Sequence, residues 1–470
     1  WAQEPRLWAL LPVLLLLAWP VMRWPPVSDL LPGLKDVKDL SVYEDAVALT
    51  HVVERADGQR LLLSDLQRMD ASSDPLAVVV QRNQARLPLL LHPGAESILF
   101  LGLGTGITAS GSLPFPSVKK RVSVELSQGA IRAAETYFRP INLGVLNRLQ
   151  VIADDGRRYL RSETERYDVI VGDLFHPDMV GRANLLSLQQ FRRVRARLAE
   201  RGVFVQWLAL NQFDVRSLKV ILATFLKAFG TGHAVVFVDG YRLAMVGFMD
   251  EPFTLERLLQ QASTLQDEAS GHEGLWTWLG RCWGEVPKGW LQEVPMQDEW
   301  SPVIEYALPR VRYEGGVDMV SMWRWLLQWR SSDEEVLRFW HAGTSHHDDL
   351  VRARAGSALD VRMWLAELDG DERRAIGYAK LARRANTRDR WPSLLLADRM
   401  FDSLQHGLPA GMTRRQALVK ILDVYPWHEG ALRDLWRLDL AAGKTLEAQR
   451  WHDRLAVIAP LAIDVRSDLH

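Results

Sequence analysis

An apolar run that ends in a glycine-rich turn, at residues 98–106, constrains the fold of this chain more than any other feature. It reads Ile-Leu-Phe-Leu-Gly-Leu-Gly-Thr-Gly, with Gly102, Gly104 and Gly106 in the turn. A short apolar run bounded by turn residues is typical of a buried parallel strand. Glycines there let the backbone pass close to a ligand, and the following helix N-terminus offers free N–H groups. The pattern predicts a ligand-binding α/β domain.

Three further strands are expected after this turn, and each ends in acidic residues. The first of them ends at Glu125, the next in Asp155 and Gly156, and the last at Asp173. Ligands of open α/β sheets bind beyond the carboxyl ends of the strands, so these acids should converge on one crevice. Glu125 follows Gly102 at about the distance at which an acid meets a ribose hydroxyl pair. Acids that only cap the following helices remain the alternative.

Length and composition limit the class of protein. A chain of 470 residues predicts two to four domains, and 57 basic against 58 acidic residues give no bulk charge that favours nucleic acid. The single cysteine, Cys282, excludes an intrachain disulfide and a cysteine-based zinc cluster. The histidines and aspartates of residues 341–349 lack helical ligand spacing, so they predict a solvated loop. We therefore expect neither a metal nor a nucleic-acid partner.

A membrane helix is expected within residues 1–25. The 16-residue run Leu7–Met22 carries no charge, is flanked by Arg6 and Arg23, and has tryptophans near both ends. Interfacial tryptophans of this kind are typical of membrane helices, although the run is slightly short. A signal-peptide core is less favoured because no small-residue cleavage site follows. The sequence predicts a membrane-anchored protein with its catalytic domain on the cytoplasmic face.

Two domains are expected to follow. Residues 26–95 predict a small β-domain, in which strand-like runs at 46–53 and 60–63 flank a turn. Residues 96–310 alternate between strand and helix patterns, as a doubly wound sheet requires. Within them, a hairpin is expected around Asp239-Gly240, a helical insertion at 252–297 and a last strand at 302–306.

Residues 311–470 are expected to be helical throughout. Pro392, Pro426 and Pro460 recur every 34 residues, which is the period of tetratricopeptide helix pairs, with an irregular bundle as the alternative. Tryptophans are frequent here, and 14 of the 19 follow residue 270. Such aromatics predict core packing first and a partner surface second. We expect this region to bind a protein partner.

Eight short motifs between residues 84 and 306 are specific when taken together. They are Gln84-Ala-Arg-Leu-Pro-Leu-Leu-Leu-His-Pro93, Gly-Leu-Gly-Thr-Gly (102–106), Val-Glu-Leu (124–126), Asp-Asp-Gly (154–156), Asp-Leu-Phe-His-Pro (173–177), Asn-Leu-Leu-Ser-Leu-Gln-Gln-Phe (184–191), Phe-Val-Gln-Trp-Leu (204–208) and Asp-Glu-Trp-Ser-Pro-Val-Ile-Glu-Tyr (298–306). Over residues 41–310 the chain resembles the polyamine aminopropyltransferases, which are the spermidine synthases and their membrane-fused bacterial relatives.

The resemblance implies a methyltransferase-like Rossmann sheet with a small N-terminal β-domain. It also implies decarboxylated S-adenosylmethionine as the aminopropyl donor, with S-adenosylmethionine itself as the other candidate co-substrate. Carried over by position, Glu125 would hold the ribose, Asp155 the adenine amino group, and Asp173 would accept a proton from the attacking amine. His176 is the second candidate base, because the pKa of a free histidine lies near neutrality.

The chain departs from the family pattern on the acceptor side. His176 stands where polyamine-making members carry a second acid, and Val80, Gln81 and Arg82 stand at their Tyr-His-Glu triplet. Glu44 replaces a glutamine that contacts the nucleoside. Fewer carboxylates and an added arginine weaken the case for a polycationic acceptor.

Three functions remain open at this point. The first is a membrane-anchored transferase that acts on a small-molecule amine, and the second is a non-catalytic scaffold or assembly subunit that retains the fold. The third, an NAD dehydrogenase, is disfavoured because Ile107 stands at the last glycine of a Gly-x-Gly-x-x-Gly pattern. The three converging acids favour the first reading.

Overall fold

The structure is a computed structural model that describes residues 27–30, 34, 36–174, 176–263 and 273–467. The expected membrane helix at Leu7–Met22 lies outside these residues. Among the residues described, no helix combines the length and the apolar character that crossing a bilayer requires.

The N-terminal region forms a four-stranded antiparallel sheet in the order β1-β2-β3-β4. The strands are β1 (Val37–Glu44), β2 (Leu49–Arg55), β3 (Arg60–Ser64) and β4 (Gln67–Ser72). The hairpin expected between β2 and β3 is confirmed, whereas the two outer strands were not expected. Val52 and Leu62 of the sheet pack against Phe138, which follows α4 (Gln128–Thr136).

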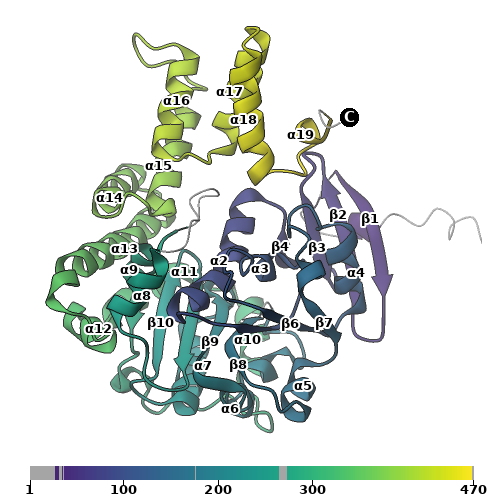
Figure 1. Cartoon of the computed structure of the whole chain (residues 1–470), viewed down its shortest axis with the longest axis vertical. Helices are drawn as coiled ribbons and strands as arrows, with labels where there is room; N and C mark the ends of the chain where they lie inside the picture. The colour runs from purple at the N-terminus through teal and green to yellow at the C-terminus, as the bar shows by residue number, and fades with distance from the viewer. Residues whose placement is uncertain (1–26, 31–33, 35, 175, 264–272, 468–470) are drawn as a thin grey trace, which may run out of the picture.

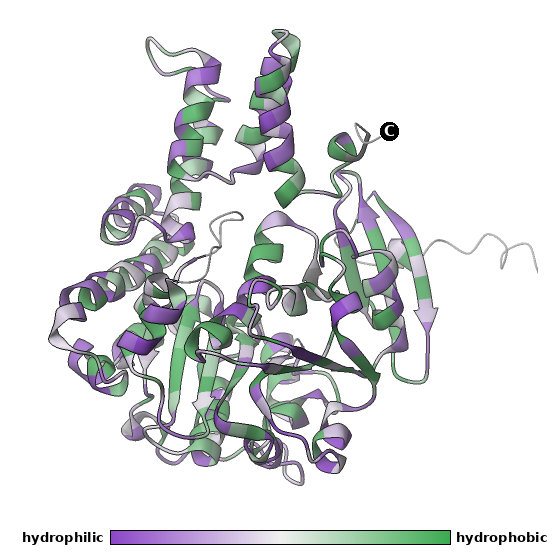
Figure 2. Cartoon of the chain, viewed as in Figure 1, coloured by the Kyte–Doolittle hydropathy of each residue, from purple (hydrophilic) through white to green (hydrophobic). Residues whose placement is uncertain are grey.

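An eight-stranded sheet forms the centre of the molecule, in the order β12-β10-β11-β9-β8-β5-β6-β7. Its strands are β5 (Ser97–Leu101), β6 (Lys120–Glu125), β7 (Gln150–Ala153), β8 (Tyr167–Leu174), β9 (Leu198–Ala209), β10 (Ala234–Asp239), β11 (Arg242–Phe248) and β12 (Cys282–Gly284). Strands β7, β6, β5, β8 and β9 are parallel, and the remaining pairings are antiparallel. The expected α/β fold and its closing hairpin are confirmed. Figure 2 shows the apolar character of the central strands.

Helices flank this sheet and connect its strands. They are α3 (Ile107–Ser110), α4, α5 (Gly156–Ser162), α6 (Leu188–Ala196), α7 (Val215–Phe229), α8 (Leu255–Ala262), α9 (Leu275–Gly280) and α10 (Ile304–Tyr313). Two expectations were wrong. The insertion at 252–297 is not all helical, because β12 joins the edge of the sheet. Residues 304–306 begin α10 and 302–303 precede it, so no strand forms here. Ile304 and Leu308 lie one helical turn apart and are both buried.

Helix α2 (Pro75–Leu91) belongs by contact to the large sheet, although residues 26–95 were expected to form the β-domain. Asp74 caps its N-terminus by accepting from the N–H groups of Leu76 and Ala77, and all residues from Val78 onward are buried. Trp207 of β9 donates from Nε1 to the carbonyl of Gln84 at 3.0 Å. Burial on all sides explains why this helix shows no polar face.

Residues 311–467 are helical, as expected. The helices are α11 (Met319–Trp329), α12 (Asp333–Phe339), α13 (His347–Leu368), α14 (Glu372–Ala385), α15 (Arg390–Ser403), α16 (Arg414–Val424), α17 (Glu429–Ala441), α18 (Thr445–Ile458) and α19 (Ile463–Ser467). Trp323, Trp329 and Trp340 are fully buried in the cores of the large sheet, so the division expected at residue 310 does not coincide with a break in the core. Helices α16 to α18 project from the rest of the molecule and pack around a separate small core (Figure 1).

The expected 34-residue period holds for one interval only. Pro426 lies between α16 and α17 and Pro460 between α18 and α19, whereas Pro392 lies inside α15. The residues that cap α15 and α17, Asp389 and His428, are 39 positions apart because a longer loop joins α15 to α16. The prolines at 392 and 426 are therefore not equivalent.

A buried ionic network attaches the C-terminal helices to the sheet. Arg281 contacts Asp239 at 2.9 Å and Asp389 at 2.8 Å, and Arg390 contacts Asp239 at 2.6 Å. Glu273 binds both arginines, and all five side chains are buried. Because an unpaired charge is costly to bury, this network fixes α15 against the β10–β11 hairpin.

Candidate active site

The glycine-rich turn lies between β5 and α3, and its backbone requires glycine. Gly102, Gly104 and Gly106 have φ values of 115°, 53° and 76°, a region that other residues rarely adopt. A Cβ at Gly102 or Gly104 would meet no atom within 4 Å. The backbone conformation therefore demands glycine at these two positions, and the space above them is open to a ligand.

Glu125 stands at the end of β6 and holds this turn in place. Its Oε2 accepts from the N–H groups of Leu103 at 2.7 Å and Gly104 at 3.1 Å, and its Oε1 accepts from Ser127 at 2.9 Å. The carboxylate thus lies at the mouth of the turn, where the sequence placed it. In this structure its role is structural, because it orders the backbone of the glycine turn.

Asp155 is the N-cap of α5, next to Gly156. Its Oδ1 accepts from the backbone N–H of Arg157 at 2.7 Å, and its Oδ2 lies 3.2 Å from the Arg157 guanidinium. Burial opposes ionisation of this carboxyl, but the hydrogen bonds from Arg157 outweigh it and lower the pKa of Asp155. The helix-capping alternative therefore describes the contacts that Asp155 makes in this structure. Gly156 has an ordinary backbone conformation, and a Cβ there would make only a normal contact with Leu101.

Asp173, near the end of β8, has the most perturbed carboxyl of this group. Burial raises the pKa of Asp173 to about 6, and the side-chain amide of Gln84 beside it lowers that value in part. The residue as a whole is nevertheless exposed to solvent. The Nε2 of Gln84 is buried and makes no hydrogen bond of full geometry among the described residues. Gln84 was not singled out as a site residue in the sequence, although it opens one of the motifs.

His176 is buried and adopts a left-handed conformation with φ at 56°. Its Nδ1 lies 3.2 Å from NH2 of Arg312, and its backbone N–H donates to Oε1 of Gln212 at 3.0 Å. A guanidinium only donates, so Nδ1 accepts and the proton of the neutral ring resides on Nε2. Nδ1 also lies 3.8 Å from Oδ1 of Asp178. With Nδ1 engaged by Arg312, His176 is a weaker candidate base than Asp173.

Two arginines lie close to Asp178, the acid in the loop after β8. Arg312 of α10 contacts Asp178 at 2.6 Å, and Arg182 lies 3.7 Å from Asp65 in the N-terminal sheet. Burial lowers the pKa of Arg182, and Asp65, Asp178 and Glu125 oppose that effect, which places Arg182 near all three acids. Sequence reasoning missed Arg312 because residues 302–306 were expected to form a strand that ended before it.

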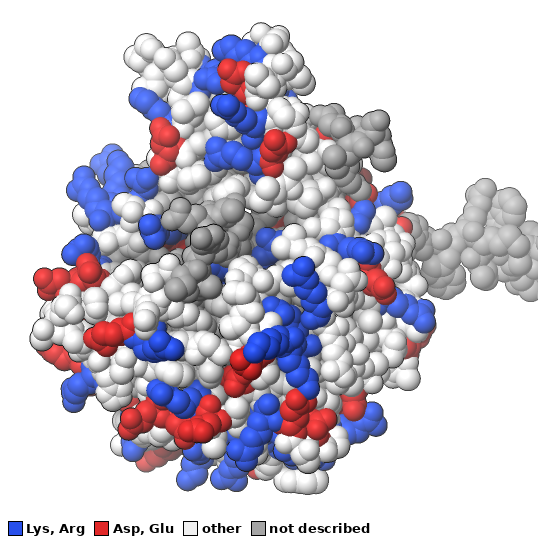
Figure 3. Space-filling model, viewed as in Figure 1, with Lys and Arg blue, Asp and Glu red and all other residues white. Residues whose placement is uncertain are grey.

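Metal ligation finds no support in the part of the chain that the structure describes, where no group of three or more potential ligands is found. His347 contacts Asp348 at 3.2 Å on an exposed surface at the start of α13. On the face shown in Figure 3, basic and acidic side chains are interspersed over most elements, as the balanced composition implies.

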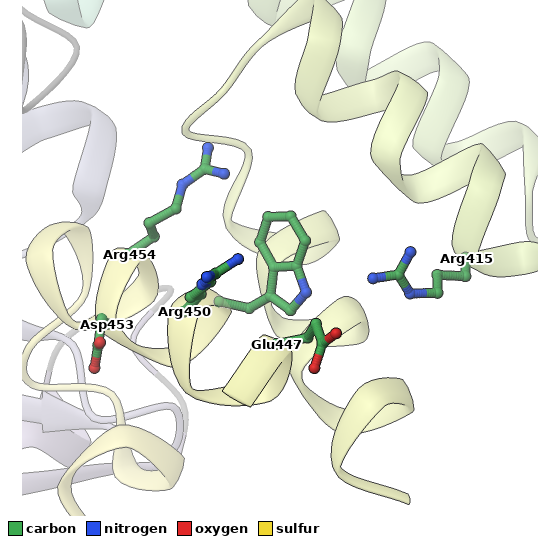
Figure 4. Close-up of a pocket in the computed structure, with 6 residues that line it drawn as sticks. Arg415, Glu447, Arg450, Asp453 and Arg454 are labelled. Carbon is green, nitrogen blue, oxygen red and sulfur yellow. The ribbon is translucent and has the colours of Figure 1, made fainter. Parts of the chain in front are cut away.

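A cleft of about 490 Å³ lies between α16 and α18, away from the residues expected to form the site. Figure 4 shows Arg415 on one side and Arg450 and Arg454 on the other. The buried Asp439 of α17 fixes two walls of the cleft, because it accepts from Arg415 at 2.8 Å and from Nε1 of Trp451 at 3.0 Å. This cleft lies on helices with their own core. Leu461, which follows α18, packs against Ile107 at the start of α3.

Comparison with known proteins agrees with the geometry at the strand ends. Residues 78–252 match the spermine/spermidine synthase domain. The chain carries a spermine/spermidine synthase domain. This domain begins within α2 and ends after β11, so it contains the glycine turn, Glu125, Asp155 and Asp173. Arg312 lies outside it.

Individual relatives cover only part of this chain. A polyamine aminopropyltransferase of Thermococcus kodakarensis is 34% identical over 126 residues, which are 25% of this chain and 43% of that protein. Polyamine aminopropyltransferase 1 of Aquifex aeolicus is 29% identical over 150 residues, which are 32% of this chain and 52% of that protein. The chain thus spans about half the length of these curated relatives. The spermidine synthase of Thermotoga maritima superimposes with a TM-score of 0.43 and 19% identity over 49% of this chain and 79% of that one.

Proposed function

We propose that the chain is an aminopropyltransferase that moves the aminopropyl group of decarboxylated S-adenosylmethionine to an amine. The amine nitrogen attacks the carbon beside the sulfonium, the C–S bond breaks, and neutral methylthioadenosine leaves. A protonated amine has no lone pair, so the acceptor must lose a proton in the site. The donor is already activated, so positioning supplies much of the remaining rate enhancement.

The observation that carries this proposal is the state of Asp173. Asp173 is an exposed residue near the end of the parallel strand β8, and among the described groups no cation is paired with its carboxyl. Burial raises the pKa of Asp173 to about 6, which is close to the pH at which a general base works best. Glu125 and the glycine turn would hold the ribose, with the adenine near Asp155.

Calorimetry with methylthioadenosine, decarboxylated S-adenosylmethionine and S-adenosylmethionine tests the nucleoside site. Mass spectrometry of reactions with a panel of amines then tests transfer. We expect the thioether and the decarboxylated nucleoside to bind. Folded protein that gives no heat with any of the three would remove the proposal.

One observation favours the second candidate, a non-catalytic scaffold. The carboxylates of Glu125 and Asp155 both make hydrogen bonds that a ligand-free protein needs for its own loop and helix. A scaffold would retain them for that reason alone. The cleft between α16 and α18 is where we propose that a protein partner binds under either function. The calorimetric experiment separates the two candidates.

We also propose that residues 7–22 anchor the protein in a membrane, with the synthase domain on the cytoplasmic face. Carbonate extraction of native membranes tests the anchor, because an anchored chain stays in the pellet. Cys282 is fully buried and cannot report sidedness by labelling. Ser403→Cys, at an exposed position of α15, supplies the thiol instead. Its labelling by an impermeant reagent in intact cells would contradict the proposed side.

A further inference from the structure

Nearly every acidic side chain around the candidate crevice already has a partner within the protein. We infer that the acceptor is an amine without a second cationic group, so that its end remote from the reacting nitrogen is neutral or anionic. This inference rests on the proposed aminopropyl transfer and narrows its substrate class.

The loop after β8 offers no free carboxylate to a remote ammonium. Its acid, Asp178, lies 2.6 Å from NH1 of Arg312, and the same guanidinium contacts Nδ1 of His176 through NH2. The Asp178 side chain is 12% exposed, whereas that of Arg312 is 50% exposed, so water screens this pair only from the arginine side. An incoming ammonium would have to displace a guanidinium from a short ion pair.

On the side of the N-terminal sheet, the negative charge of Asp65 is also compensated by an arginine. Asp65 accepts from the N–H of Leu49 at 2.9 Å and lies 3.7 Å from Arg182. Arg182 is largely enclosed and lies near Glu125 as well, so it adds positive charge between the sheet and the loop. A second cation placed here would meet this guanidinium as a like charge.

The acids at the other strand ends also have hydrogen-bond or ion-pair partners within the protein. Asp154 contacts Arg158 at 2.5 Å, Asp155 contacts Arg157 at 3.2 Å, and Glu125 accepts three backbone N–H groups. Among the described acids at the ends of β6, β7 and β8, Asp173 alone faces no cation. One carboxyl can receive the proton of the reacting nitrogen, but it cannot also neutralise a second ammonium.

The remaining polar side chain suits a neutral or anionic acceptor. The Nε2 of Gln84 is a buried N–H donor beside Asp173. Donors of this kind bind hydroxyl or carboxylate oxygens. They repel an ammonium, which has no acceptor and loses its hydration shell on entry.

Three acceptors with the same four-carbon spacing test the inference on the full-length protein. They are 1,4-diaminobutane, 4-aminobutan-1-ol and 4-aminobutanoate, whose remote groups are cationic, neutral and anionic. Release of methylthioadenosine from decarboxylated S-adenosylmethionine gives kcat/KM for each. We expect kcat/KM for the better of 4-aminobutan-1-ol and 4-aminobutanoate to exceed that for the diamine by at least 10-fold.

The outcomes separate the inference from the proposed function. A diamine that is used as well as or better than both others overturns the inference and leaves aminopropyl transfer standing. Transfer to none of the three, by a protein that binds methylthioadenosine, removes the transfer and the inference with it.

A matched pair of variants at His176 provides a second test. Asp and Asn both tolerate the left-handed conformation of this residue, and they have the same shape but differ in charge. His176→Asp should shift the ratio of kcat/KM toward the diamine by at least 10-fold, mainly through KM. His176→Asn should not shift it. Equal ratios in the two variants would show that charge at this position does not select the acceptor.

Discussion

Replacing Asp173 by asparagine should stabilise the fold and abolish most of the activity. Burial raises the pKa of Asp173 from its ordinary 3.8 to about 6, so the folded state binds this proton more tightly than the unfolded chain does. The native state therefore loses stability as the pH rises from 3.8 through 6, and above that pH it carries the full cost of the charge.

The size of this cost follows from the change in pKa. At about 1.4 kcal/mol per pH unit, it amounts to about 3 kcal/mol, which is an upper bound. The side chain is exposed, and solvent screening reduces the figure, so we expect about 1 kcal/mol. Asp173→Asn removes the charge without changing the shape of the side chain. The variant should thus gain about this much stability at pH 8 and almost none at pH 4.

Urea unfolding of both proteins at pH 4, 6 and 8 measures this difference, and a turnover assay accompanies it. Turnover should fall by roughly 100-fold, the usual scale for loss of a general base, while methylthioadenosine affinity stays nearly unchanged. A difference in unfolding free energy that does not grow between pH 4 and pH 8 would refute the reasoning from burial. Normal turnover would assign the base to another residue.

Asp168→Asn is the matched control at the other end of β8. Its carboxylate accepts from the backbone N–H groups of Glu96 and Ser97, each at 2.9 Å. The same substitution there removes charge from two good hydrogen bonds, so it should lower stability at pH 8. Opposite signs at the two positions of one strand would exclude a general effect of asparagine.

Three further perturbations test the remaining architecture. Glu125→Gln should weaken methylthioadenosine binding about 10-fold or more in calorimetry, because charge-assisted hydrogen bonds to the glycine turn are worth about 1.5–3 kcal/mol. Unchanged affinity would show that Glu125 does not order the turn for the nucleoside. Deleting residues 413–470 should leave a folded protein that binds nucleoside but loses its partners in pull-down. Deleting residues 311–470 removes tryptophans from the main core and should yield no folded protein. Folded protein from this second deletion would refute the shared core. Arg390→Met should lower the free energy of unfolding in urea by about 3–5 kcal/mol, because it leaves buried acids unpaired. The control Arg437→Met, at an exposed ion pair, should lower it by about 0–1 kcal/mol. Equal losses in the two variants would count against the buried network.

The sequence alone was enough to predict the sheet, the turn and the acids at the strand ends. Periodic apolar runs encode buried strands locally, and the left-handed backbone of Gly102 explains its glycine without reference to any distant residue. The position of Asp173 followed from the rule that parallel strands end at one edge. The same local reasoning failed for residues 302–306, where a short apolar run suits a strand or a helix equally well.

Only the tertiary structure decided how these residues are charged and partnered. Arg312 and His176 are 136 positions apart, and they meet because α10 packs next to the loop after β8. The pKa of Asp173 depends on how many protein atoms surround it, and Gln84 reaches it from a helix that the sequence suggested belonged to another domain. Spacing along a chain predicts which element a residue occupies. Electrostatics depends on distances between elements, and those are set by packing of the whole fold.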